Sequence, residues 1–256
     1  MAALGRGLKS TRDLYLLQHD PDVVRARLFD WAPQMDATWQ IALFGALWIA
    51  AAVALIAGHR ARLGAAVIVA AALFQQVVDH TFAAFHMDYM VVVLLLTAVS
   101  DSDADLSVRW LRAGRPANVT VVAWPMWLQQ LQLSIVYFYT AVAKLNDAYL
   151  TGQLLRDRLA LPAFLHDPSV LQWFAGGTVA LEFFLVVALW SRRLRPFGFA
   201  SGIALHVLVP ILMGPYVGLL AFSLLTLSVY LLFVDDATID RVIDVVVSRL
   251  HLRLVR

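Results

Sequence analysis

The chain has no cysteine among its 256 residues, and only 15% of its residues are charged. The absence of cysteine excludes disulfide bonds and thiolate metal sites. The low charge excludes an ordinary soluble domain, because a soluble surface of this size needs more polar side chains. The first twenty residues contain no long apolar run, so no cleaved signal peptide is predicted. Glycine-rich phosphate loops and nucleophile elbows are also absent.

The remaining composition is strongly apolar. Hydrophobic residues make up 61% of the chain, and the mean hydropathy is +0.73. These values indicate an integral membrane protein with one helical domain. The net charge is only +2, and the arginines stand between apolar runs. That distribution orients helices in a lipid bilayer and does not predict nucleic-acid binding.

The apolar segments predict an all-α polytopic transmembrane bundle with about six net crossings. These segments are residues 39–58, 63–99, 121–143, 170–190, 196–212 and 216–234. At ~1.5 Å per residue and ~30 Å of hydrocarbon, the second segment is too long for one straight helix and short for two. We therefore predict a helix, a break near residues 79–86 and a half-helix from about Met87. Together they would make one net crossing.

Two flanking segments border the transmembrane domain, which is predicted at residues 39–234. Residues 1–38 are interpreted as a cytoplasmic or interfacial segment in which Phe29 and Trp31 anchor a short surface helix, and no additional span is evident there. Residues 235–256 carry apolar residues at helical spacing. They predict an amphipathic helix on the membrane surface.

The arginines give a predicted orientation. With six crossings, the basic residues of segments 6–27, 109–115, 192–195 and the tail fall at one end, while Arg60 and Arg62 fall at the other. Because the richer end should be cytoplasmic, both termini are expected inside. Lys144 would then lie near the outer face.

The segment "VYFYTAVAKLNDAYLTG" places Lys144 at the end of an apolar helix. Tyr137 and Thr140 lie on the same helix face, at three- and four-residue spacing. Such a polar stripe normally faces protein or a water-filled cavity, because lipid cannot satisfy it. Two interpretations stay open. In the first, the long apolar side chain of Lys144 lets its amine reach the lipid headgroups. In the second, the amine is partly desolvated and acts as a base.

A second polar feature lies at the break in segment 63–99. The motif "FHMDYM" places His86 and Tyr89 on one face at the start of the half-helix. A helix N-terminus favours a neutral imidazole or an anionic ligand, and broken helices at membrane depth usually line a cavity. The alternative is that His86 and Asp88 only cap the helix.

Two further polar residues stand inside apolar helices: Glu182 in "VALEFFLVV" and His206 in "ALHVLVP". Each alone is usually a hydrogen-bonded structural group. Together with His86 and Lys144 they indicate one polar centre inside the bundle. Residues of metal-ligand type are also present, but no two histidines lie one turn apart, so no metal site is assigned. These residues are Asp79, His80, His86, Glu182 and His206.

Residues 127–155, "WLQQLQLSIVYFYTAVAKLNDAYLTGQLL", resemble the signature helix and loop of the HTTM domain. This domain is the transmembrane module of vitamin K-dependent gamma-glutamyl carboxylase and its bacterial relatives. The matching positions are Gln132, Ile135, Val136, Tyr137, Phe138, Lys144, Leu145, Tyr149 and Gly152. The motif "FHMDYMVVVLLL" resembles the family's half-helix, with Phe85 in place of an asparagine. Later family features are matched by Glu182, His206, Gly214 and Pro215.

The resemblance covers roughly residues 30–235 and implies quinol-coupled chemistry. In the carboxylase, the lysine deprotonates reduced vitamin K, oxygen addition yields a strong base that removes a glutamate proton, and carbon dioxide adds to the carbanion. By this resemblance Lys144 is the base and His86 its partner. Residues expected to shape the cofactor pocket are Tyr137, Tyr89, Thr140, Glu182 and His206. The implied cofactor is reduced vitamin K or menaquinol, with oxygen and carbon dioxide as co-substrates, in a bacterial plasma membrane.

A non-enzymatic alternative stays open: a quinone-binding or lipid-binding accessory subunit, or a small-molecule transporter. Under the enzyme hypothesis a partner must supply the protein or peptide substrate, because no large extramembrane segment follows the last span. The two hypotheses differ in geometry. An enzyme needs Lys144 and His86 on one cavity, close enough to share a proton directly or through a water.

Overall fold

The computed structural model of the chain describes residues 1–19, 29–35, 37–104, 107, 120–156, 167–214, 217–235, 237–242 and 245. The long helices are α1 (Ala2–His19), α2 (Thr38–Ile56), α3 (Ala61–Val78), α4 (Phe85–Val99), α6 (Trp124–Ala143), α9 (Pro168–Ala188), α10 (Arg195–Leu212) and α11 (Val217–Tyr230). Short helices are η1 (His80–Phe82), α7 (Asp147–Leu150), α8 (Gln153–Arg156) and η3 (Leu231–Phe233). Across these ranges no strand occurs, and the predicted all-α bundle is confirmed.

Four of the helices, α2, α3, α9 and α10, are long and apolar enough to cross a membrane. Helix α4 and the segment 217–233 are shorter apolar helices. Large apolar side chains cover the outer surface, such as Leu43 and Leu47 on α2, which are 51% and 55% exposed. Lipid rather than water is the solvent that such a surface requires. The chain is therefore an integral membrane protein.

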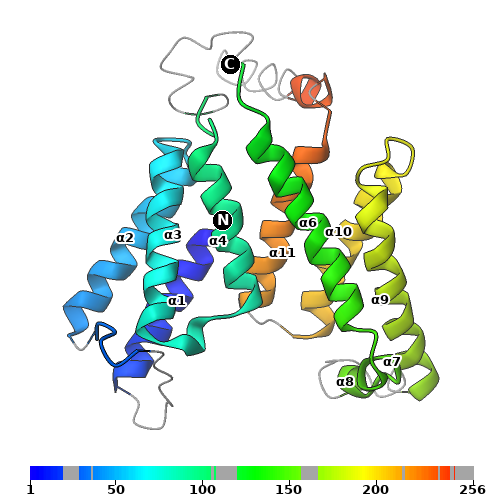
Figure 1. Cartoon of the computed structure of the whole chain (residues 1–256), viewed down its shortest axis with the longest axis horizontal. Coiled ribbons are helices and arrows are strands. Elements are labelled where there is room, and N and C mark those ends of the chain that lie inside the picture. Colours follow the sequence, from blue (N-terminus) through cyan, green and yellow to red (C-terminus); the bar gives the residue numbers. More distant parts are fainter. Residues whose placement is uncertain are drawn as a thin grey trace, which may run out of the picture.

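The bundle has two groups of helices joined by α11. Figure 1 shows α2, α3 and α4 on one side of the view and α6, α9 and α10 on the other. Helix α11 contacts α1, α4, α6 and α10. This central position brings residues from the two groups to one site.

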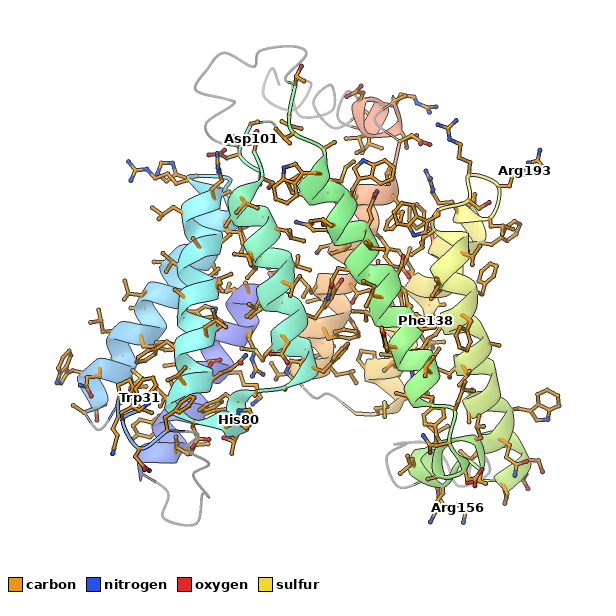
Figure 2. All side chains as sticks on the ribbon, in the orientation of Figure 1. Trp31, His80, Asp101, Phe138, Arg156 and Arg193 are labelled. Carbon is orange, nitrogen blue, oxygen red and sulfur yellow. The ribbon has the colours of Figure 1, made fainter. Side chains whose placement is uncertain are left out.

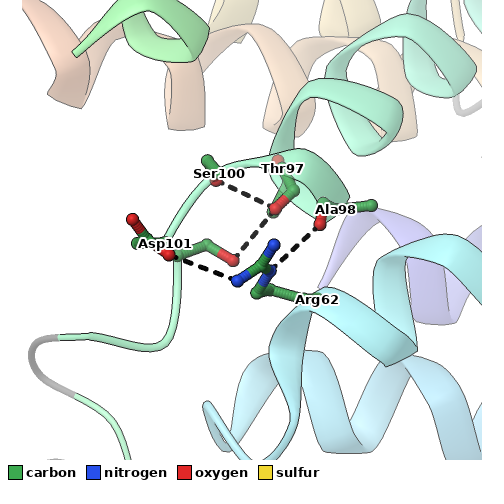
Figure 3. A network of polar contacts seen from close by, with 6 residues as sticks. Arg62, Thr97, Ala98, Ser100 and Asp101 are labelled. Atoms are coloured by element: carbon green, nitrogen blue, oxygen red, sulfur yellow. Dashed lines mark hydrogen bonds and ion pairs between the residues drawn. The ribbon is translucent and has the colours of Figure 1, made fainter. Parts of the chain in front are cut away.

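Residues 63–99 form an antiparallel hairpin. Arg62, at the start of α3, donates hydrogen bonds of 3.2 Å to the carbonyl of Ala98 and to the carboxylate of Asp101, just beyond the end of α4 (Figure 3). The start of α3 and the end of α4 therefore lie at the same end of the bundle. The prediction of one net crossing is wrong, because the 15 residues of α4 run back along α3.

The reversal between α3 and α4 lies where the sequence predicted a break. The buried Asp79 ends α3 and begins η1, and its carboxylate accepts hydrogen bonds from the backbone N–H (2.8 Å) and the hydroxyl (2.6 Å) of Thr81. These two bonds stabilise a tight turn that an apolar chain alone would not form. The predicted break is therefore confirmed.

The hairpin changes which basic residues lie at each end of the bundle. Figure 2 shows Asp101 and Arg193 at one end of the bundle and His80 and Arg156 at the other. Arg62 pairs with Asp101, so it lies at the end that carries Arg193. The predicted separation of Arg62 from residues 192–195 is wrong. Which end faces the cytoplasm stays a prediction.

Helix α1 belongs to the bundle, which the sequence analysis missed. Trp48 of α2 donates its indole N–H to the carbonyl of Ala3 at 2.9 Å. At Gly45 of α2, an added Cβ would lie 2.4 Å from the hydroxyl of Thr11. Helix α1 also packs against α11, with Leu14 only 3% exposed.

The two predicted surface helices fall largely outside the described residues. At the first, Phe29 and Trp31 are exposed, and their rings stack with centroids 5.0 Å apart. At the second, residues 237–242 are helical. The assignment of residues 235–256 to the membrane surface stays a prediction, as does the side of the membrane on which residues 1–38 begin.

Polar residues of α6 connect this helix to its neighbours. Gln129 donates to a main-chain carbonyl of α4 at 3.3 Å, and Gln130 donates to the carbonyl of Leu232 at 2.6 Å. Ser134 accepts a 2.8 Å hydrogen bond from the indole of Trp190. The polar stripe therefore faces protein, as lipid exclusion requires. The same face leads to Lys144.

Candidate functional site

A cavity of about 810 Å³ lies among α4, α6, α9, α10 and α11. Six of the seven residues predicted for the site line it: Lys144, Glu182, His86, His206, Tyr137 and Thr140. Leucine, phenylalanine, valine and methionine side chains form most of the remaining wall. The structure thus gathers the predicted polar residues at one apolar-walled cavity. Their chemical roles stay predictions.

Lys144 and Glu182 form an ion pair at this cavity. The lysine is the C-cap of α6, and its Nζ donates to Oε1 of Glu182 in the middle of α9. The lysine side chain is 24% exposed and the glutamate side chain 7%. The amine is thus directed at a carboxylate between two helices, in contrast to the headgroup interpretation.

The second carboxylate oxygen of Glu182, Oε2, takes no part in the ion pair. Oε2 is buried, and it has no hydrogen-bond partner within the described part of the chain. A buried acceptor without a donor costs about 1–3 kcal/mol. This oxygen is therefore a favourable position for a donor group on a ligand.

The position of Glu182 follows from the buried face of α9. Leu171, Ala175, Val179, Glu182 and Leu185 repeat at three- and four-residue spacing, and all are buried. This face packs against α6. The helix register therefore turns Glu182 toward the end of α6, where Lys144 stands.

The short turn after α6 closes one side of the site. Gly152 has φ +77°, and an added Cβ would lie 2.4 Å from the Cβ of Leu171. Only glycine fits this close approach to α9. The turn brings the ring of Tyr149 to 5.7 Å from Nζ of Lys144. Burial raises the pKa of Tyr149 above its ordinary value, so the ring is neutral at neutral pH.

A hydrogen-bonded chain of three side chains forms another wall. The hydroxyl of Tyr137 lies 2.8 Å from Nε2 of His206 and 2.6 Å from the hydroxyl of Tyr230. All three residues are buried, with 2%, 6% and 4% of their surface exposed. Gly202 gives Tyr230 its space, since an added Cβ would lie 1.9 Å from that hydroxyl.

Tyr230 was not predicted from the sequence. It stands in "LSVYLLF", and aromatic residues are common in membrane helices. Nothing in the local pattern distinguishes it from a packing residue. Only the position of α11 between α1 and α10 brings its hydroxyl to Tyr137.

His86 reaches the cavity from the first turn of α4. Its Nε2 is buried without a hydrogen-bond partner among the residues described. Ala84 is the N-cap of α4 and provides no side-chain cap, while Asp88 accepts a 3.2 Å hydrogen bond from Gln76. The capping alternative is therefore not observed for His86.

Two neighbours of His86 differ from expectation. Tyr89 does not line the cavity; it is buried with its ring centroid 5.8 Å from that of Phe222. Phe85, which replaces the family asparagine, lines the cavity and lies 6.2 Å from the same ring. This position therefore supplies apolar wall instead of a hydrogen bond to the imidazole.

No group of metal-ligating side chains was found in the described part of the chain. Over the described ranges, no three histidine, aspartate or glutamate side chains are grouped so that they could hold a metal ion. Asp79 is engaged with Thr81 in the turn between α3 and α4, away from the cavity lining.

The comparisons with known proteins agree with this architecture. The family model described as the HTTM domain matches residues 6–236, and this range contains every residue that lines the cavity. No curated protein and no solved structure matches the chain significantly. Since the family match covers nearly the whole sequence, the chain belongs to the HTTM domain family, that of the vitamin K-dependent carboxylase-associated domain.

Proposed function

We propose that the protein binds a quinol in this cavity and that Lys144 and Glu182 move the proton of a ring hydroxyl, as in a gamma-carboxylase-like enzyme. The observation that carries the proposal is a buried ion pair, with one unpartnered carboxylate oxygen, on an apolar-walled cavity. A volume of about 810 Å³ suits a ligand of this size. The wall matches a ring with an apolar tail, and the few polar groups match its oxygens.

The ion pair can provide the base. Desolvation disfavours the charged forms of both groups. A base requires Lys144 as the neutral amine, and Glu182 is the group placed to take up its proton through the contact between Nζ and Oε1. The partner of Lys144 in the structure is thus a carboxylate, where the sequence suggested the histidine His86.

The other polar groups can hold the ligand. A bound quinol would supply a ring hydroxyl whose deprotonation makes the ring reactive toward oxygen. Oε2 of Glu182 accepts a donor, and Nε2 of His86 provides a second polar contact on the α4 side. Reduced vitamin K and menaquinol both fit this description. Oxygen and carbon dioxide would be co-substrates, and a partner would present the protein or peptide acceptor.

The experiment adds menaquinol without oxygen to purified protein in lipid nanodiscs, admits oxygen, and measures quinone epoxide by mass spectrometry. We expect epoxide from the wild type and at least a tenfold loss in Lys144→Ala and Glu182→Gln. Arg62→Ala is the matched control, because it removes an exposed ion pair at the opposite end of the bundle. An inactive wild type would refute quinol oxygenation, and an active Lys144→Ala would exclude the lysine as the base.

The second candidate is a binding module without turnover. The observation in its favour is Phe85, which cannot hydrogen-bond the neighbouring imidazole as an asparagine could. Under this hypothesis menaquinol binds, measured by co-purification and mass spectrometry, but no epoxide forms. Phe85→Asn would then test whether the missing amide limits the chemistry, since the enzyme hypothesis expects this variant to gain activity.

A further inference from the structure

The chain formed by Tyr230, Tyr137 and His206 has a preferred direction of hydrogen bonding. Two hydroxyl protons and one imidazole proton are available for the two contacts of 2.6 Å and 2.8 Å. If Tyr230 donates to Tyr137, and Tyr137 donates to Nε2 of His206, both hydroxyl protons are used. The imidazole proton then resides on Nδ1.

The reverse direction is less favourable. If Nε2 of His206 donated to Tyr137, and Tyr137 donated to Tyr230, the proton of Tyr230 would have no acceptor among the described residues. Tyr230 is only 4% exposed, so water does not readily replace that acceptor. A buried donor left unpaired costs about 1–3 kcal/mol. The first direction instead leaves the Nδ1–H of His206 unpaired within the protein, but this residue lines the cavity and Nδ1 is not among the buried atoms without a partner, so water or a ligand can accept that proton. The first direction is therefore the more favourable one.

We propose that Tyr137, supported by Tyr230, fixes the tautomer of His206 so that its Nδ1–H donates to an oxygen of the cavity ligand. His206 lines the cavity, and its Nδ1 has no partner in the described part of the protein. Tyr137 is thus a positioning residue, because its own hydroxyl is occupied by two protein partners.

The surroundings hold this chain in place. The ring of Phe199 stacks on Tyr230 at 5.6 Å, and Gly202 leaves space for its hydroxyl. Phe222 packs against His206 from α11 with ring centroids 5.7 Å apart. The imidazole is therefore held by the ring of Phe222 and by its bond to Tyr137, which a directional donor requires.

The assignment also specifies the ligand. The cavity presents a hydrogen-bond donor on α10, at His206, and an acceptor on α9, at Oε2 of Glu182. A matching ligand carries one acceptor oxygen and one hydroxyl donor. A quinol ring has both groups, whereas a quinone has acceptors alone. This part of the inference rests on the proposed function.

The test is nitrogen NMR of the protein labelled with ¹⁵N-histidine in nanodiscs, with His206→Gln to assign the signal. We expect the wild type to carry the proton on Nδ1 and Tyr137→Phe to show both tautomers in comparable amounts. Tyr230→Phe should keep the tautomer but shift the Nε2 signal, because the remaining bond is weaker. Tyr139→Phe is the control, since Tyr139 is 62% exposed and lies only two residues from Tyr137 on the same helix.

A wild-type proton on Nε2, or an unchanged tautomer in Tyr137→Phe, would overturn the proposal. Addition of menadiol, the quinol form of menadione, in the absence of oxygen tests the ligand separately from the tautomer. A shift of the Nδ1 signal supports donation to a quinol oxygen. An Nδ1–H tautomer that menadiol leaves unshifted would overturn the quinol ligand and leave the role of Tyr137 in place.

Discussion

Removing one member of the Lys144–Glu182 pair is expected to destabilise the protein more than removing both. Glu182 is 7% exposed and sits on the face of α9 that packs against α6. In Lys144→Met its carboxylate loses the cation and remains buried. In Glu182→Leu the ammonium group of Lys144 can still be hydrated, because its side chain is 24% exposed. The two single variants should therefore differ.

The magnitudes follow from burial. Breaking a buried ion pair from one side costs about 3–5 kcal/mol. We expect Lys144→Met to approach this range and Glu182→Leu to cost about 1–3 kcal/mol, because the free ammonium stays partly hydrated. The double variant replaces the pair by two apolar side chains and should lie within about 1 kcal/mol of the wild type. The coupling energy is then about 3 kcal/mol or more.

The assay is reversible unfolding of the four proteins in mixed micelles, evaluated as a double-mutant cycle. The pair Arg62–Asp101 provides the control cycle, because its side chains are 47% and 41% exposed. Exposed pairs contribute about 0.2–1 kcal/mol. If the Lys144–Glu182 coupling were no larger than that control, the pair would not be desolvated, and the argument for a neutral amine would be refuted.

Two further predictions concern packing and topology. Gly202→Ala should destabilise the fold by about 1–3 kcal/mol, because its Cβ would collide with the tyrosine hydroxyl; Gly177→Ala, with nothing within 4 Å, should be neutral or stabilising in the same unfolding assay. Because the chain has no cysteine, His59→Cys, Ser102→Cys and Arg156→Cys can each be labelled singly in intact cells with an impermeant maleimide. The hairpin predicts that the first two label from one side and the third from the other, whereas labelling of the first two from opposite sides would contradict it.

Much of the fold could be predicted because lipid imposes a simple constraint. Runs of apolar residues long enough for the bilayer must be helices, and most predicted spans end within a few residues of the observed helices. The break near residues 79–86 could also be found, since Asp79 and His80 interrupt an apolar run. Length could not decide between a half-helix and a hairpin, because α4 has only 15 residues.

Helix α1 was missed for a related reason. It carries Arg6, Lys9 and Arg12 among its residues, so hydropathy does not separate it from a surface segment. One face of α1 packs against α2 and α11, and Trp48 of α2 bonds to the carbonyl of Ala3. A helix that packs on protein along one face can carry charges on the rest of its surface, and mean hydropathy does not identify it.

The sequence predicted most of the polar residues that line the cavity, but not which of them contact one another. A charged or hydrogen-bonding side chain inside an apolar helix must find a partner, which is why Lys144, Glu182, His86 and His206 could be assigned to one centre. Which partner each side chain contacts depends on which helices pack against each other. The sequence suggested His86 for Lys144, but α6 packs most closely on α9, so the lysine meets Glu182.

Three unpartnered atoms at the cavity bear on the proposed ligand. Oε2 of Glu182, Nε2 of His86 and Oγ of Ser223 are buried without a partner in the described chain, and all three residues line the cavity. Each such atom costs about 1–3 kcal/mol while it stays unpaired. A saturated lipid chain would leave that cost in place, whereas a ligand with oxygen groups removes it. Because such a ligand removes the cost of these unpaired atoms, we expect the cavity to bind an oxygen-bearing ring more tightly than a lipid tail.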